Sequence, residues 1–128
     1  VLLAGLEFVA DQRLGRPLGT FDRPRPERAE ARRSDRSLRN VTLSISALSD
    51  LAQALSTAPT PVTDQAFADA LDEARALDDP IFDGVSDPSG RLRVEILQQR
   101  VQAIRTAVSA EIGAQLGVGT GFNSADGD

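Results

Sequence analysis

The feature that most constrains the fold of this chain is a regular apolar pattern between residues 91 and 116. Branched aliphatic side chains recur there at steps of three or four positions: Val94, Leu97, Val101, Ile104, Val108 and Ile112. Because an α-helix completes a turn about every 3.6 residues, this spacing aligns all of them on one face. The pattern therefore predicts a long helix over residues 91–116 that buries this face against other helices.

Two further segments have the same periodicity. One stripe predicts a long helix over residues 26–56, with Pro26 in its first turn: Leu38, Val41, Ile45, Leu48, Ala52 and Leu55. Another stripe predicts a helix over residues 62–78: Phe67, Leu71, Ala74 and Leu77. Thr63 or Asp64 can cap the start of this helix, and the acidic residues in its first half suit the helix dipole.

The fourth helical segment lies at the start of the chain. Residues 1–13 are predicted to form a helix that stops within residues 14–19, where Gly supplies a C-cap and Pro blocks continuation. A polar loop follows the third helix, and three of its apolar residues are expected to anchor it to the core: Ile81, Phe82 and Val85. No segment shows the alternation of a strand. We therefore expect an all-α fold in which residues 1–128 form an up-and-down four-helix bundle.

Composition excludes several kinds of chemistry. The chain contains neither His nor Cys, so it cannot by itself supply a histidine base, a thiolate or a Ser–His pair. It also contains no Lys, which excludes a phosphate-binding loop of the P-loop type. Five Phe are the only aromatic residues, and the net charge is −5. Few aromatic side chains are available to stack on bases, and the net charge is negative. Both features argue against nucleic acid as a partner.

A polar patch precedes the stripe of the second predicted helix. On a helix that begins at residue 26, four polar residues share the face that becomes apolar from residue 41 onwards: Glu30, Arg33, Ser34 and Ser37. Asn40 would flank them. Polar groups on a core-facing stripe need partners or a wet cleft, which makes this patch a candidate ligand-binding site. The alternative is that the end of the helix is simply solvated.

The last residues contain a second, weaker candidate. Asn123, Asp126 and Asp128 offer oxygen ligands close to glycine, which a divalent cation such as Ca²⁺ could use. Their spacing does not match an EF-hand loop, in which acidic or amide positions alternate before the glycine and a Glu closes the site. A flexible polar terminus is the alternative interpretation of this segment.

Parts of the sequence at both ends resemble the imelysin family. Residues 14–19 (LGRPLG), 30–34 (EARRS) and 37–40 (SLRN) resemble the start of the second half of imelysin-like proteins. Residues 116–128 (LGVGTGFNSADGD) resemble the C-terminus of that family. The order and spacing of these motifs extend the resemblance over nearly the whole chain.

The resemblance implies an exported, periplasmic protein of two four-helix bundles that is often lipid-anchored and is associated with iron uptake. This chain would be the C-terminal bundle, with the N-terminal half and any export signal upstream of Val1. The family is also classed with metallopeptidases through a Gly-x-His-x-x-Glu motif in that N-terminal half, which a chain without His does not contain. Iron or another divalent metal is the implied cofactor of the intact protein. The implied partners are the N-terminal half and other periplasmic iron-uptake components.

We therefore expect the chain to contribute one wall of a ligand site between the two bundles. Arg33 would hold an anion or a carboxylate, and Glu30 would pair with Arg33 or join the outer shell of a metal. Two alternatives remain open: the non-catalytic half of a metal-dependent peptidase, and a structural helical domain for protein contact. The chain alone is expected to have no peptidase activity.

Overall fold

The computed structural model describes residues 1–117, and this part of the chain is helical. The main elements follow in the order α1 (Leu2–Phe8), the π-helical segment η1 (Val9–Leu14), α2 (Gly15–Leu18), α3 (Ser37–Leu55), α4 (Pro61–Ala76) and α5 (Pro88–Gln115). Three short 3-10 turns interrupt the connections: η2 (Pro26–Arg28), η3 (Arg32–Ser34) and η4 (Asp83–Ser86). An isolated bridge between Thr20 and Arg23 is the only strand-like pairing among residues 1–117.

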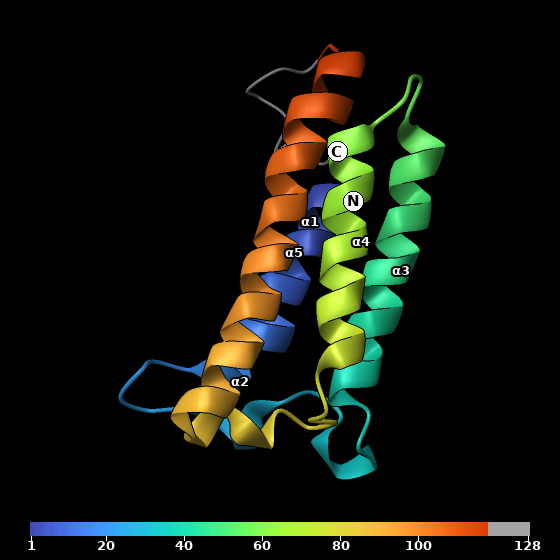
Figure 1. Ribbon diagram of the computed structural model, residues 1–128. Coiled ribbons are helices and arrows are strands. Elements are labelled where there is room, and N and C mark those ends of the chain that lie inside the picture. Colours follow the sequence, from blue (N-terminus) through green and yellow to red (C-terminus); the bar gives the residue numbers. More distant parts are fainter. Residues whose placement is uncertain (118–128) are drawn as a thin grey trace.

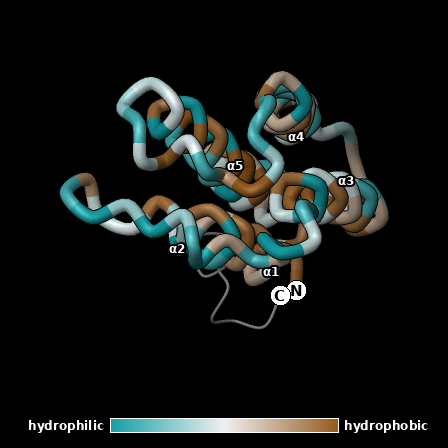
Figure 2. Tube along the Cα trace, turned by 90° about the horizontal axis from the view of Figure 1, so that it is seen from below, coloured by the Kyte–Doolittle hydropathy of each residue, from teal (hydrophilic) through white to brown (hydrophobic). Residues whose placement is uncertain are grey.

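The helices lie side by side as columns (Figure 1), the first of which is the continuous run of α1, η1 and α2. Successive columns run in opposite directions, so that α3 and α5 ascend in Figure 1 while α4 descends between them. The packing between α4 and α5 is the most extensive, and α5 also contacts α1, η1, α2 and α3. Viewed along the columns, hydrophobic residues gather on the sides of the helices that face one another (Figure 2).

The predicted helix over residues 91–116 is confirmed as α5, which begins three residues earlier, at Pro88. Every member of its apolar stripe is fully buried: Val94, Leu97, Val101, Ile104, Val108 and Ile112. Asp87 caps the helix, because its side chain accepts a hydrogen bond from the backbone N–H of Gly90 at 3.2 Å. This stripe is the centre of the core against which the other columns pack.

The other two apolar stripes also face the core. On α3, Val41, Ile45 and Ala52 are buried, while the leucines of the stripe are partly buried against the core. On α4, Phe67 and Ala74 are buried. Leu77, which follows α4, is buried as well, and Leu71 is partly buried. In the loop after α4, Phe82 and Val85 are buried as predicted, and Ile81 is partly buried.

The predicted helix over residues 26–56 is wrong in its first third, because α3 begins only at Ser37. Ala31 and Asp35 have φ values of 59° and 57°, which a right-handed helix cannot contain. A helix in water is stabilised mainly by packing an apolar face, and residues 26–36 offer only Ala29 and Ala31 for this purpose. The segment instead forms η2 and η3, joined by irregular backbone.

The first helix stops within residues 14–19 and ends at a glycine, as predicted, but Pro17 lies inside the helix and does not block it. The chain remains helical through Leu18, and the residue that ends it in the left-handed region is Gly19, with φ 57°. The π-helical segment η1 makes this continuation possible. The carbonyl oxygen of Ala10 accepts from the N–H of Gly15, five residues on, and from Gln98 Nε2 at 2.9 Å. A side chain of α5 thus stabilises the wider turn.

The start of α4 is capped from another helix, so the expectation that Thr63 or Asp64 caps it is also wrong. The carboxylate of Glu111 on α5 accepts hydrogen bonds from the backbone N–H groups of Val62 and Thr63, at 3.1 and 2.5 Å. A carboxylate at a helix N-terminus satisfies otherwise unpaired N–H groups and favours the helix dipole. None of the helices in residues 1–117 is both long and apolar enough to span a membrane.

Candidate functional site

The predicted polar patch is organised around an arginine that is not among the predicted site residues. Arg13 lies in η1, and its Nη1 donates to the backbone oxygen of Asn40 at 3.0 Å and to the hydroxyl of Ser44. Its Nε lies 3.4 Å from Glu30 Oε2, which makes an ion pair. We refer to Arg13, Glu30, Ser37, Asn40 and Ser44 as the Arg13 cluster.

Glu30 joins the Arg13 cluster through both its side chain and its backbone. Its Oε1 accepts from Asn40 Nδ2 at 3.4 Å, and its backbone oxygen accepts from the hydroxyl of Ser37 at 2.6 Å. Ser37 is buried at the start of α3, and its hydroxyl satisfies a carbonyl of the irregular segment before the helix. The cluster therefore holds the loop before α3 against both η1 and α3.

Arg13 itself is mostly buried. Its side chain is 21% exposed, whereas that of Glu30 is 46% exposed. The guanidinium also lies 5.2 Å from the centre of the Phe8 ring, within the range of a cation–π contact. A charge in such a place needs a counter-charge, and Glu30 supplies it.

Three of the five predicted site residues are thus brought together, and two are not. Arg33 and Ser34 lie in η3 and are exposed. The Ser34 hydroxyl donates to the backbone oxygen of Ala31 at 3.1 Å. Among the hydrogen bonds and ion pairs of residues 1–117, none joins Arg33 or Ser34 to the Arg13 cluster. The common helix face on which they were placed does not exist, because the backbone reverses at Ala31 and Asp35.

A sequence signal for Arg13 does exist. It falls within the apolar stripe of the first column, three residues after Ala10 and four after Val9, both of which are buried. A charged residue at a core-facing position needs a buried partner, by the same reasoning that singled out Glu30. What the sequence could not supply is the partner, because Asn40 and Ser44 are more than 25 residues away along the chain.

A cavity of about 410 Å³ lies next to the Arg13 cluster. Its walls come from the first column and from the η2 segment: Phe8, Gln12, Arg16, Glu27, Arg28 and Glu30. Glu30 therefore belongs to both features, with its carboxylate bound by Arg13 and its exposed side facing the cavity wall. At this cavity a predicted site residue thus lines walls that carry charges of both signs.

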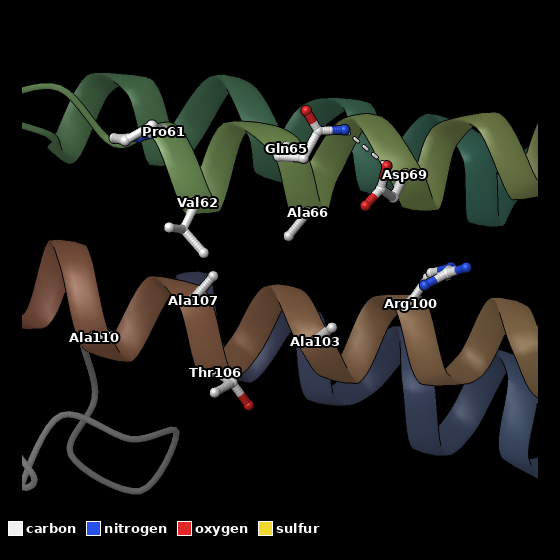
Figure 3. A pocket seen from close by; sticks show the side chains of 10 residues that line it. All are labelled: Pro61, Val62, Gln65, Ala66, Asp69, Arg100, Ala103, Thr106, Ala107 and Ala110. Atoms are coloured by element: carbon white, nitrogen blue, oxygen red, sulfur yellow. Dashed lines mark hydrogen bonds between the residues drawn. The ribbon is translucent and has the colours of Figure 1, made fainter.

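A larger groove of about 650 Å³ runs between α4 and α5 (Figure 3). Small residues form most of its floor, including Ala66, Ala103 and Ala107. The charged residues along it are held by neighbours, since Asp69 accepts from Gln65 at 2.8 Å and Arg100 lies 3.8 Å from Glu73. Without converging polar groups, the groove has the character of an apolar surface and not of a catalytic site.

A site that coordinates a metal ion directly does not fit the described part of the chain. Residues 1–117 contain no group of three or more acidic, His or Cys side chains placed to hold an ion. Glu30 is a single carboxylate already occupied by Arg13, which suits a role in supporting other ligands better than direct coordination. The other metal candidates, Asn123, Asp126 and Asp128, lie outside the described residues.

Comparison with protein-family models matches residues 1–108 to Peptidase_M75, described as Imelysin. The match covers the Arg13 cluster, the helices from α1 to α4 and α5 as far as Val108, and it ends before the C-terminal motif at residues 116–128. Searches of curated proteins and of solved structures gave no match.

Proposed function

Because this chain belongs to the imelysin family, we propose that it is the C-terminal bundle of a two-bundle periplasmic protein that takes part in iron uptake. In this proposal residues 1–128 form an up-and-down four-helix bundle. An N-terminal half carries the His-containing motif of the family and the export signal or lipid anchor. The partners of the intact protein are other periplasmic iron-uptake components.

The observation that carries the proposal is the Glu30 carboxylate, which Arg13 fixes from one side while 46% of the side chain remains exposed. A carboxylate held in this way keeps its orientation, as residues behind a metal ligand do. In the intact protein Glu30 would accept a hydrogen bond from a metal-ligating side chain of the opposite bundle. Asn40, bonded to the same carboxylate, would restrict its rotation.

Arg33 and Ser34 have a different part in the proposal. Both are exposed on η3, close in sequence to the Arg13 cluster but not bonded to it. Arg33 would hold an anion or a carboxylate of the opposite bundle through its planar guanidinium. The C-terminal residues Asn123, Asp126 and Asp128 would add oxygen ligands for a divalent cation. When bound, iron or another divalent metal would supply Lewis-acid character to the site.

The experiment is a calorimetric titration of the intact, full-length protein with ferrous iron under anaerobic conditions. Glu30→Gln removes the charge but preserves the shape. We expect it to weaken metal affinity about tenfold, as does loss of a group that hydrogen-bonds to a metal ligand. Glu27→Gln is the matched control, since Glu27 lines the same cavity but pairs with Arg25 instead. Equal affinities for wild type and Glu30→Gln would contradict the proposal, as would an Arg33→Ala variant unchanged in both affinity and thermal stability.

The peptidase label of the matched family favours one alternative, in which this chain is the non-catalytic half of a metal-dependent peptidase. The chain contains no His, Cys or Lys with which to activate water or a nucleophile. A protease assay of the intact protein beside the metal titration separates the two functions. Metal binding without peptide hydrolysis would support the role in iron uptake, whereas metal-dependent hydrolysis would support the peptidase function. A protein that does neither would act as a structural contact domain.

A further inference from the structure

Two arginines line the cavity beside the Arg13 cluster without a carboxylate partner. Arg16 comes from α2 and Arg28 from η2. None of the ion pairs or side-chain hydrogen bonds of residues 1–117 engages either guanidinium. Five other arginines of the chain, at positions 13, 25, 32, 91 and 100, do pair with a carboxylate.

The two acidic residues of the same cavity are neutralised from outside it. Glu27 Oε1 lies 3.7 Å from Arg25, and Glu30 Oε2 lies 3.4 Å from Arg13. Neither Arg25 nor Arg13 lines the cavity. With these pairs counted as neutral, the charge that remains at the cavity is that of two guanidinium groups. An unpaired positive charge of this kind attracts a small anion.

Backbone hydrogen bonds fix the segments that carry the two arginines relative to each other. The N–H of Arg25 donates to the carbonyl of Pro17 at 2.9 Å, and the N–H of Arg28 donates to the carbonyl of Arg25 at 3.0 Å. Pro17 follows Arg16 directly in α2. The loop from residue 19 to residue 25 therefore closes back on α2, so that η2 and its Arg28 are held beside the helix that carries Arg16.

We propose that this cavity binds a small oxyanion, a carboxylate or a phosphate, between Arg16 and Arg28. The planar fork of a guanidinium matches the oxygens of either group and can bind them in a bidentate manner. Gln12 also lines the cavity and can donate a further hydrogen bond from its amide, and Phe8 adds an aromatic ring to the lining. The volume of about 410 Å³ suits a small organic acid or a phosphate group, not a polymer segment.

The inference is independent of the proposed function, because it concerns neither metal nor the opposite bundle. It can be tested on the intact, full-length protein by calorimetric titration with two probes, inorganic phosphate and succinate, at low ionic strength. We expect saturable binding of at least one probe with Kd of about 1 mM or tighter. Affinity should fall as salt is raised, because exposed charges are screened. The stronger probe then identifies the preferred oxyanion.

Three single substitutions assign the binding to the cavity. Arg16→Gln and Arg28→Gln are each expected to lower the affinity for the tighter-binding probe about tenfold, because each removes one charged, bidentate donor. Arg23→Gln is the matched control, an exposed arginine from the same loop region that does not line the cavity. All the altered side chains are exposed, so the melting temperature should stay close to that of wild type.

The inference is overturned if neither probe gives saturable heat up to about ten times the expected Kd. It is equally overturned if Arg23→Gln weakens binding as much as the cavity substitutions do, since the affinity for the anion would then depend only on the net charge of the protein. Loss of anion binding in Arg16→Gln with unchanged iron affinity in the intact protein would separate this site from the metal role of Glu30.

Discussion

Arg13 connects three parts of the chain that are far apart in sequence. Its guanidinium contacts Glu30 in the irregular segment, and Asn40 and Ser44 on α3, while its backbone belongs to η1. A partly buried cation with several partners stabilises an arrangement more than an exposed ion pair does, because its removal leaves partly desolvated polar groups without partners.

Replacement of Arg13 is therefore expected to destabilise the fold. Arg13→Ala should lower the free energy of unfolding by about 1–3 kcal/mol, because the carbonyl of Asn40 and the hydroxyl of Ser44 lose their donor. Urea denaturation followed by circular dichroism measures this difference. Arg39→Ala, an exposed arginine on α3, is the control and should change stability by less than about 0.5 kcal/mol. Equal effects of the two substitutions would show that the cluster contributes nothing specific.

Glu111 makes the stability of the fold depend on pH in a defined direction. Partial desolvation acts to raise the pKa of its carboxyl, but hydrogen bonds from Thr63 and Val62 outweigh it and lower the pKa below the usual 4.5. A lowered folded-state pKa means that the ionised form stabilises the fold. This contribution is fully present above pH 4.5 and is lost as the pH falls through the folded-state pKa.

The Glu111→Ala substitution tests this contribution. At pH 7 it should lower the free energy of unfolding by roughly 1 kcal/mol, the usual effect of losing a helix cap. The difference from wild type should shrink as the pH falls below 4.5, where the wild-type carboxylate becomes protonated. Thermal melts across this pH range provide the measurement, with Gln102→Ala as an exposed control on α5. A difference that stays constant with pH would contradict the capping role.

At the scale of elements, the start of α5 depends on how closely it approaches η4. A Cβ at Gly90 would lie 2.4 Å from the carbonyl oxygen of Gly84, a backbone atom that cannot move aside cheaply. Gly90 also donates its backbone N–H to the capping side chain of Asp87. The turn before α5 and the first turn of the helix are thus packed backbone to backbone.

Gly90→Ala separates helix propensity from this packing. Alanine is favoured over glycine inside a helix by about 1 kcal/mol, so propensity alone predicts a stabilised protein. Because the added methyl group would collide with Gly84, we expect instead a loss of about 1–3 kcal/mol in the free energy of unfolding. Differential scanning calorimetry gives the sign directly. A higher melting temperature for Gly90→Ala would show that η4 moves away easily.

The elements themselves could be predicted where an apolar stripe continues for several turns. The stripes of α3, α4 and α5 each face the core, although Leu71 is only partly buried and its neighbour Ala70, outside the predicted stripe, is fully buried. The sequence failed where no stripe exists, before Ser37, because polar residues alone do not decide between a helix and irregular backbone. It also failed at η1, where a contact from Gln98 stabilises a wider turn that local sequence does not encode.

At the scale of the whole molecule, charge is unevenly divided along the chain. Residues 1–40 contain nine Arg against six acidic residues, whereas residues 41–90 contain one Arg against nine. The first of these segments contributes both the Arg13 cluster and the cavity with Arg16 and Arg28. The overall charge of −5 therefore conceals the part of the molecule that is suited to anions.

The sequence by itself determined the all-helical class, the buried face of each long helix, the absence of histidine chemistry and the resemblance to the imelysin family. These follow from local periodicity, from composition and from short motifs, none of which requires knowledge of distant contacts. The sequence also identified Glu30, Ser37 and Asn40 as candidates, although for a helical face that does not form.

Only the tertiary structure decided how those three residues meet and which residues complete the site. Arg13 contacts Asn40 and Ser44, which lie 27 and 31 positions further along the chain. Glu111 caps a helix through Thr63, which lies 48 positions before it. Such pairings depend on how the columns pack against the stripe of α5. Local sequence fixes which faces are apolar, but it does not fix which polar group of one column lies opposite which group of another.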